Sequence, residues 1–274
     1  MNIPHHKAQE FQQQIWAFYS QNARTMPWRE NPDPYWVMVS EIMLQQTQVD
    51  RVQPKFIVFM ERFPSIRALA KAPLSDVLTV WSGLGYNRRA KFLWQAARQV
   101  IEQHQGVVPA NLTELMALPG IGPNTAGAIM AYAFNEPVEF VETNIRTVLF
   151  HHFFENQEQV SDRELRVVVG ALLDTEHPRE WYWALMDYGA HLKKQSGGRL
   201  SQSKHYKKQS QFAGSVREMR GKIIRTLAPR SLGEFELRRE VGADERFAPA
   251  LAALLAEGLI TRHNNGQLSL TDTA

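Results

Sequence analysis

The sequence predicts a mainly α-helical protein that ends in a small α+β module. Apolar side chains recur at helical intervals from the amino terminus onward, as Phe11, Ile15, Trp16 and Tyr19 do. Proline and glycine separate the periodic segments, and no convincing strand pattern occurs before residue 215. Only residues 215–274 combine helical segments with a hairpin pattern, so we expect the sheet to be confined to that end.

Helical segments follow one another closely through most of the chain. Predicted helices span residues 7–22, 45–63, 65–71, 74–82, 88–103 and 112–117, and others begin at Thr125, Ile145, Asp162 and Arg179. The breaks between them coincide with Pro64, Pro73, Gly83, Gly85 and Pro109.

One carboxylate, Glu41, lies in an otherwise uncharged helical run, residues 40–48, that follows the nearly apolar segment 35–39. Burial penalises the ionised form of a carboxyl group, so we expect a raised pKa for Glu41. A carboxylic acid that keeps its proton near neutral pH can protonate a poor leaving group. The alternative is an ordinary glutamate on the solvent side of an amphipathic helix.

A glycine-rich turn lies within residues 118–127, between two segments of helical length. Gly120 and Gly122 permit a tight turn, which would point free backbone N–H groups at the start of the second helix outward. Such a helix–hairpin–helix can bind a phosphate of DNA. The alternative is a simple connection between two helices.

A second carboxylate, Glu142, stands between an apolar pair and a predicted helix. Thr143 or Asn144 could cap that helix, and a carboxylate near a helix N-terminus is expected to stay ionised. One protonated and one charged carboxyl group are the combination that cleaves N- or O-glycosyl bonds. The alternative role for Glu142 is helix capping alone.

These segments resemble the A/G-specific adenine DNA glycosylases of the helix–hairpin–helix superfamily. The matching motifs occur in the family's order at residues 26–29, 40–48, 81–90, 118–127, 142–149 and 184–190. The resemblance implies a two-lobed helix–hairpin–helix glycosylase fold. One lobe would combine residues 1–22 and 134–195, and a helical barrel lobe with the hairpin would span residues 23–133. A basic linker, residues 196–214, and a winged-helix-like module, residues 215–274, would follow.

The resemblance also implies roles for individual residues. Glu41 would protonate adenine N7, Glu142 would stabilise the sugar cation, and Asn144 would stand beside it. Gln46 and Tyr86 would enter the base stack, because a base that leaves the duplex needs a substitute for its stacking. The adenine pocket would include Arg24, Trp28, Leu44, Val49, Asn124 and Trp183. The DNA backbone would meet Gly120, Gly122 and Thr125.

The chain departs from the family pattern in four places. It has no cysteine, so the four thiolates of the usual iron–sulfur cluster are missing, and we expect neither that cluster nor another metal or cofactor. Glu142 replaces an aspartate, which moves the carboxylate by on the order of an ångström. Asn124 stands where related lyases carry a lysine, so we expect no lyase activity. Trp183 replaces a Gln or Glu that reads the adenine edge, which alters the expected pocket.

Composition fits a soluble intracellular protein, which in a bacterium would lie in the cytoplasm with the nucleoid. The chain is 44% hydrophobic with a net charge of +3, and it shows no membrane-spanning run or secretion signal. Residues 193–225 carry ten Lys or Arg and one acid, Glu218. We expect a flexible basic connector there, which in a DNA enzyme would neutralise phosphates. The alternative is a solvated linker without contacts.

The tail is expected to form helices over residues 215–227, 232–241 and 245–257, followed by a hairpin over residues 259–270. The third helix of a winged-helix module normally reads bases, but residues 247–257 hold hardly any basic side chains. We therefore expect this helix to pack internally or to contact a protein.

The expected partner is double-stranded DNA that contains a mismatch or a damaged base. We expect the protein to bind it as a monomer and not to associate with a membrane. The resemblance implies a monofunctional enzyme of base excision repair that removes adenine opposite 8-oxoguanine or guanine by acid-assisted hydrolysis. Two alternatives stay open, namely a glycosylase for another mispaired base such as uracil or thymine, and a non-catalytic DNA-binding protein. Glycosylases with those other preferences usually lack a glutamate at the position of Glu41.

Overall fold

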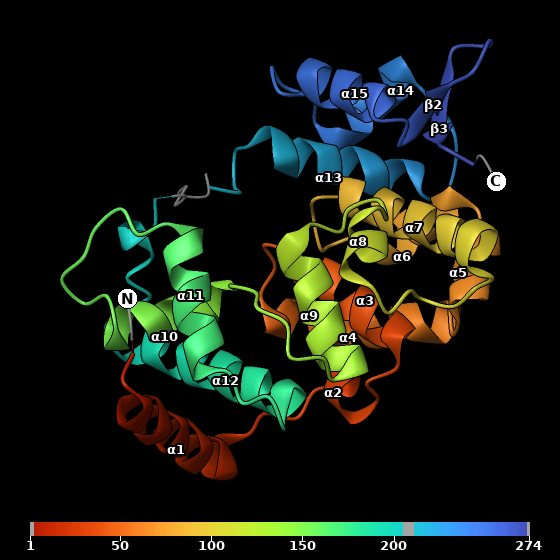
Figure 1. The fold of residues 1–274 in the computed structure, drawn as a ribbon. Coiled ribbons are helices and arrows are strands. Elements are labelled where there is room, and N and C mark those ends of the chain that lie inside the picture. Colours follow the sequence, from red (N-terminus) through yellow and green to blue (C-terminus); the bar gives the residue numbers. More distant parts are fainter. Residues whose placement is uncertain (1–2, 205–210, 273–274) are drawn as a thin grey trace. The chain divides into compact units, whose positions relative to one another are not determined.

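The computed structural model describes residues 3–204 and 211–272, and helices make up most of them (Figure 1). The first helices are α1 (His5–Asn22), α2 (Pro27–Glu30), α3 (Pro34–Leu44), α4 (Val49–Arg62), α5 (Ile66–Lys71), α6 (Leu74–Trp81) and α7 (Arg88–His104). They are followed by α8 (Leu112–Met116), α9 (Pro123–Phe134), α10 (Thr143–His152), α11 (Asp162–Leu172), α12 (Pro178–Ser196) and the 3₁₀ helix η1 (Leu200–Gln202). Among the described residues, no helix is both long and apolar enough to cross a membrane.

The carboxyl-terminal elements are α13 (Val216–Leu227), β1 (Leu232–Gly233), α14 (Glu234–Val241), α15 (Phe247–Ala256), β2 (Ile260–Arg262) and β3 (Gln267–Leu270). The mainly helical fold with a small carboxyl-terminal sheet is therefore confirmed. Residues 45–48, expected to begin a helix, form a turn instead, because Gln46 adopts a left-handed backbone with φ 56°. Leu232 and Gly233 form a strand instead of the expected first helical turn.

The chain folds into two compact units, each built from segments that are distant in sequence. The first holds the described residues of Met1–Met38, Ala110–Met116 and Ile121–Lys208, and the second holds those of Val39–Pro109, Ala117–Gly120 and Gln209–Ala274. This grouping follows other boundaries than the lobes expected from the sequence. Helix α9 belongs to the unit formed by the two flanks, and the carboxyl-terminal module belongs to the unit of α4 to α7.

The core of the first unit lies between α12 and its neighbours α1, α9 and α10. Helix α12 contributes Trp181 and Tyr182, which are fully buried. The Trp181 ring lies 6.2 Å from that of Phe11, and the Tyr182 ring lies 4.2 Å from that of Phe140. These aromatic contacts fix α12 and the segment that leads to Glu142 in one core.

The core of the second unit is built by α4 to α7. Phe56, Phe59 and Trp81 are fully buried, and helix α7 presents Ala90, Leu93 and further apolar residues to the same core at helical spacing. The two turns beside this core, residues 45–48 and 82–87, carry sequence motifs of interest.

The carboxyl-terminal module packs α13 against α14 and α15 and closes with the antiparallel sheet β1-β3-β2. In the sheet, Leu232 pairs with Leu268 and Ile260 pairs with Leu270. Within this compact unit, α13 and β3 contact α6 (Figure 1). Helix α15 buries Phe247, Leu251 and Leu254, so it serves internal packing, as its composition suggested.

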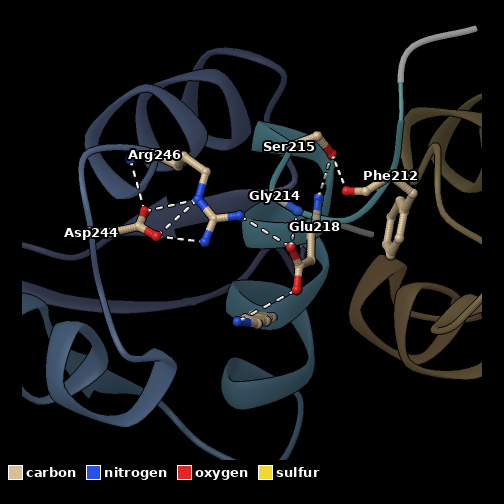
Figure 2. A network of polar contacts seen from close by, with 7 residues as sticks. Phe212, Gly214, Ser215, Glu218, Asp244 and Arg246 are labelled. Atoms are coloured by element: carbon tan, nitrogen blue, oxygen red, sulfur yellow. Dashed lines mark hydrogen bonds and ion pairs between the residues drawn. The ribbon is translucent and has the colours of Figure 1, made fainter.

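A polar network fastens the amino-terminal turn of α13 to the loop before α15 (Figure 2). Glu218 accepts hydrogen bonds from the Gly214 N–H at 2.8 Å and from the Arg246 guanidinium at 3.0 Å. Arg246 also pairs with Asp244, and this pairing lowers the pKa of Asp244 to about 2. Ser215 caps the helix by accepting from the Glu218 N–H.

The described part of the predicted basic linker is ordered where it follows α12. Val160 and Ser203 form a parallel β-bridge, and the Gln202 side-chain amide donates to the carbonyls of Phe154, Glu155 and Gln157 at 2.8–3.1 Å. Residues 199–204 are therefore not a linker without contacts, since the Gln202 side chain bonds three backbone carbonyls. Residues 205–210 of that predicted linker lie outside the described residues.

Candidate functional site

Glu41 lies one turn before the end of α3, in a helix whose other face is buried. Val39, Ser40, Ile42 and Met43 have no solvent exposure, whereas Glu41 is half-buried. The helix ends at Leu44, where the Thr47 N–H donates to the Leu44 carbonyl and Gln46 turns the chain. Glu41 thus stands in the last turn of α3, directly before the turn that carries Gln46.

Arg89 of α7 is a buried arginine that connects two turns. Its Nη1 atom donates to the carbonyls of Ile42 and Met43 at 2.8 Å each and to the carbonyl of Gln45 at 2.6 Å. Its Nη2 atom donates to Thr47 Oγ1 at 2.9 Å and to the Gly85 carbonyl at 3.2 Å. Burial lowers the pKa of Arg89 to about 10, which leaves it charged at neutral pH. Arg89 therefore caps the last carbonyls of α3 and holds both turns.

Gln46 and Tyr86, the two residues expected to enter the base stack, sit in these two turns. Both adopt left-handed backbone conformations, with φ of 56° and 47°. Such strained conformations persist where the surrounding structure enforces them, and they are typical of functional turns. The sequence analysis did not single out Arg89. Its spacing of four residues from Leu93, on the buried face of α7, is the signal that could have found it.

The helix–hairpin–helix is formed by α8, the glycine-rich loop and α9. Gly120 has φ +80°, and a Cβ atom there would lie 2.8 Å from Phe92 Cβ, so only glycine fits. The Gln45 side chain donates to the Gly120 carbonyl at 3.1 Å, which ties the loop to the turn of Gln46. Gly122 occupies the N-cap position of α9, with Asn124 and Thr125 in the first helical turn. The first N–H groups of α9 make this the expected phosphate-binding end.

Glu142 occupies the N-cap position of α10, and its Oε2 atom accepts from the Thr143 N–H at 2.8 Å. Burial raises the pKa of Glu142, while the Thr143 hydrogen bond and the charges of Arg146 and Lys193 oppose this shift. Burial therefore opposes the ionised form that the helix N-terminus was expected to favour. The expectation that Thr143 or Asn144 caps the helix is wrong.

Asn144 lies in the first turn of α10, directly against α12. A Cβ atom at Gly189 would overlap the Asn144 backbone, so glycine at this position lets the two helices meet. The close approach of α10 and α12 explains the glycine in the motif at residues 184–190 and fixes Asn144 beside Glu142.

Arg24 and Arg29 converge on the buried carboxylate of Asp187. Arg24 Nε donates to Asp187 Oδ1 at 2.7 Å, and Arg29 makes two hydrogen bonds to Asp187 of 2.8 and 2.9 Å. Arg29 also lies over the Trp183 ring, 5.4 Å from its centroid. The structure thus brings the pocket candidates Arg24 and Trp183 together through Arg29 and Asp187, neither of which was named as a site residue.

The remaining pocket candidates lie outside the cluster of Arg24, Arg29, Asp187 and Trp183. Trp28 is buried in α2, and Asn124 accepts a long hydrogen bond of 3.4 Å from the Val141 N–H, next to Glu142. Leu44 and Val49 lie at the two ends of the turn that carries Gln46, and both are half-buried. The first unit holds Arg24, Trp28, Gly122, Asn124, Thr125, Glu142, Asn144 and Trp183, and the second holds Glu41, Leu44, Gln46, Val49, Tyr86 and Gly120.

The donor set for an iron–sulfur cluster is missing from this sequence, which contains no cysteine. In residues 3–204 and 211–272, no group of three His, Asp or Glu side chains is arranged to hold a metal ion. The segment after α12 is instead held by the hydrogen bonds of Gln202.

Comparison with known proteins gives a family match and several relatives. Residues 39–169 match the family described as HhH-GPD superfamily base excision DNA repair protein. The adenine DNA glycosylase of Mycolicibacterium smegmatis is 30% identical over 94% of this chain and 94% of its own length. The adenine DNA glycosylase of Buchnera aphidicola is 37% identical over 66% of this chain, and the chain spans 52% of that relative.

Solved structures show the same fold. A thermostable thymine-DNA glycosylase aligns with a TM-score of 0.61 and 29% identity, covering 68% of this chain and 87% of its own. An endonuclease III trapped as a covalent intermediate with DNA aligns with a TM-score of 0.61 at 17% identity, covering 69% of this chain and 88% of its own.

Proposed function

Since the chain belongs to the adenine DNA glycosylases of the helix–hairpin–helix superfamily, we propose that it removes mispaired adenine from double-stranded DNA, opposite 8-oxoguanine or guanine. The reaction is the hydrolysis of the N-glycosidic bond, as the first step of base excision repair. One structural observation carries this proposal. Arg89 fixes the two strained turns of Gln46 and Tyr86 beside the helix end that bears Glu41.

The arrangement supports base flipping followed by acid catalysis. Gln46 and Tyr86 are held in fixed turns, so they can replace the stacking that the duplex loses when adenine leaves it. Phosphates of the DNA meet the hairpin at Gly120 and Gly122 and the first turn of α9 at Thr125. The resemblance to the family implies a contact with the extruded base for Arg24, Trp28, Asn124 and Trp183 of the first unit and for Leu44 and Val49 of the second.

Glu41 then donates its proton to N7 of adenine while the bond between C1′ and N9 breaks, and the bonding electrons leave with the base. A positive charge develops on the deoxyribose, and ionised Glu142 stabilises it or attacks C1′ briefly. Asn144 stands beside Glu142 in the first turn of α10. Water adds to C1′ and loses a proton to the solvent, which leaves a hydroxyl group at C1′, frees Glu142 as the carboxylate and completes the abasic site.

Strand cleavage does not follow, because the amide of Asn124 cannot form a Schiff base with the opened sugar. The monofunctional reaction is tested with duplexes that each contain a single A:8-oxoguanine, A:guanine, T:guanine or U:guanine pair. We expect the adenine strand to break only after hot alkali, and only in the adenine duplexes. Breakage of the thymine or uracil strand would favour the other base specificity, and no breakage in any duplex would favour a non-catalytic DNA-binding protein.

Changing Glu41→Gln should separate chemistry from binding. Without the proton donor, the single-turnover rate of adenine excision should fall by about 10² to 10⁴-fold, while duplex affinity changes little. Rapid-quench kinetics and fluorescence anisotropy measure the two quantities. Glu102→Gln is the matched control, because Glu102 is exposed on α7 and belongs to neither turn. A Glu41→Gln protein with the full rate would remove the acid role.

A further inference from the structure

Two arginines share one buried carboxylate within the first compact unit. Asp187 lies on α12 and is 3% exposed, Arg24 lies between α1 and α2, and Arg29 belongs to α2. Asp187 Oδ1 accepts from Arg24 Nε at 2.7 Å and from Arg29 Nη2 at 2.8 Å. Asp187 Oδ2 accepts from the Arg24 backbone N–H and from Arg29 Nη1 at 2.9 Å each. Each oxygen thus accepts from both arginines, so the lone pairs of this carboxylate are occupied.

Arg24 is held by its backbone as well as by its side chain. Asp187 accepts the N–H of Arg24, and the carbonyl of Arg24 accepts a hydrogen bond of 3.1 Å from Arg29 Nη1. Arg24 Nη2 lies 2.7 Å from Asp187 Oδ1, whereas Arg24 Nη1 makes no hydrogen bond within the described part of the chain. The Arg24 side chain is 37% exposed, and that of Arg29 is 8% exposed. Arg29 is therefore a buried support, and Arg24 is the arginine that keeps an available donor.

The same carboxylate also acts on Trp183 through Arg29. The Arg29 guanidinium lies over the Trp183 ring, 5.4 Å from its centroid. The Tyr132 ring stacks on Trp183 with a centroid distance of 6.2 Å and an interplanar angle of 25°. Asp187 therefore fixes Arg24 directly and contributes to the position of Trp183, so that two pocket candidates depend on one side chain.

The charges of this cluster do not balance. Among the described residues, Asp187 is the one acid that pairs with Arg24 or Arg29, so one positive charge is left without an ion pair. A buried ion cluster pays for its desolvation, and apolar side chains of similar volume often serve stability equally well. Stability alone therefore does not account for two guanidinium groups around one carboxylate. A cationic donor suits a ring nitrogen of a purine, and it favours the electrons that move onto the base as the glycosidic bond breaks.

We propose that Asp187 is a positioning residue which, together with Arg29, orients Arg24 Nη1 toward an acceptor nitrogen of the extruded purine. The inference rests on the proposed function, because the extruded adenine must reach the pocket that contains Arg24. Asp187 and Arg29 do not touch the base themselves. They fix the donor before the base arrives, so that binding does not have to order a long and flexible side chain.

Single-turnover excision of adenine tests this role. Arg24→Met leaves Asp187 paired with Arg29, and it should lower the rate at least about tenfold because a charged hydrogen bond to the base is lost. Asp187→Asn should lower the rate to a similar extent. The double variant should lose at most about twofold more than Arg24→Met alone, since both changes remove one interaction.

Asp174→Asn is the matched control. It removes another carboxylate of the first unit, one that accepts from Trp16 Nε1 at 3.2 Å and pairs with neither arginine. Its rate should equal that of the wild type when the protein is in excess over DNA. Rates of Arg24→Met or Asp187→Asn that equal the wild-type rate would overturn the proposal, and so would losses that add in the double variant.

A binding measurement separates positioning from a purely structural role. One duplex carries 2′-fluoro-2′-deoxyadenosine opposite guanine, in which the fluorine destabilises the sugar cation and slows cleavage. The other carries tetrahydrofuran, which has no base, at the same position. Arg24→Met and Asp187→Asn should weaken binding of the first duplex at least about fivefold and of the second by less than about twofold. Equal weakening for both duplexes would indicate a structural role and would overturn the proposal.

Arg29→Lys provides a second route to the same result if Asp187→Asn does not fold. Lysine keeps the charge but cannot form the paired hydrogen bonds of Arg29 with Asp187, so the same selective loss is expected. Wild-type affinity of Arg29→Lys for both duplexes would contradict the proposal. If the wild type excises no adenine at all, the proposed function fails, and the two binding measurements still decide whether Asp187 and Arg24 act on the base.

Discussion

At the scale of single residues, Glu142 is placed where two effects on its carboxyl group oppose each other. Burial raises its pKa, whereas the Thr143 N–H and the positive charges of Arg146 and Lys193 favour the ionised form. A positive sugar in the reaction would add another charge that favours ionisation. The residue is therefore suited to respond to the developing cation, and its charged form opposes folding in the absence of DNA.

Because burial disfavours the charged carboxylate of Glu142, we predict that Glu142→Gln stabilises the folded protein. The same change should remove activity. Because folding raises the pKa of Glu142, the protein loses stability as the pH rises through that folded-state value. The melting temperature of Glu142→Gln should therefore exceed that of the wild type at pH 8, measured by calorimetry. The difference should vanish below the ordinary glutamate pKa of 4.5, where the carboxyl group is protonated in both states.

Glu136→Gln serves as the control, because Glu136 is exposed and lies in the same connection before α10. Its melting temperature should follow that of the wild type across this pH range. A Glu142→Gln protein that is less stable than the wild type at pH 8 would contradict the argument from burial.

At the scale of elements, Arg89 joins the end of α3 to the turns at residues 45–48 and 82–87 by hydrogen bonds. One guanidinium satisfies three carbonyls at the end of α3 and the following turn, and a fourth at Gly85. Helix ends leave such carbonyls without intrahelical partners, so a buried cation near them is strongly favourable. Arg89 thus holds the residues on both sides of Gln46 and the residue before Tyr86.

Arg89→Met should therefore cost at least about 2 kcal/mol of folding free energy, because it leaves several buried carbonyls unpaired. Urea denaturation measures this loss, and excision by the variant should fall together with it. Arg98→Met is the matched control on the same helix. Arg98 stacks on Trp94 at 4.8 Å, and its loss should cost less than about 1 kcal/mol. Equal losses for both variants would show that Arg89 has no special role in joining the turns.

At the scale of the whole molecule, the net positive charge is small, but many basic residues lie in one segment of the chain. The chain carries 31 Lys and Arg against 28 Asp and Glu, yet ten of the basic residues fall within residues 193–225. Those near the end of α12 and on α13 belong to different compact units. Each unit can thus contribute phosphate contacts of its own, and binding to DNA should depend strongly on salt.

We expect the affinity for an undamaged duplex to fall at least about tenfold between 50 and 200 mM salt, measured by anisotropy. The paired change Lys194→Gln and Lys204→Gln should make the salt dependence shallower, since both side chains are exposed within this basic segment. Lys7→Gln with Lys71→Gln removes the same charge elsewhere on the surface and should leave the slope unchanged. Identical slopes for both pairs would exclude a special role of the segment.

The sequence by itself determined the helices, the glycine-rich hairpin, the carboxyl-terminal module and the identity of the candidate residues. The elements follow from local rules, since helical spacing, capping residues and glycine turns act over a few positions, whereas most candidate residues rest on the resemblance to the family. Only the tertiary structure decided the environment of Glu142, the joining of Arg24 to Trp183 through Asp187 and Arg29, and the contact of Arg217 with Tyr86. Arg217 and Tyr86 are 131 positions apart in the chain, and burial and pairing over such separations depend on how the whole chain packs.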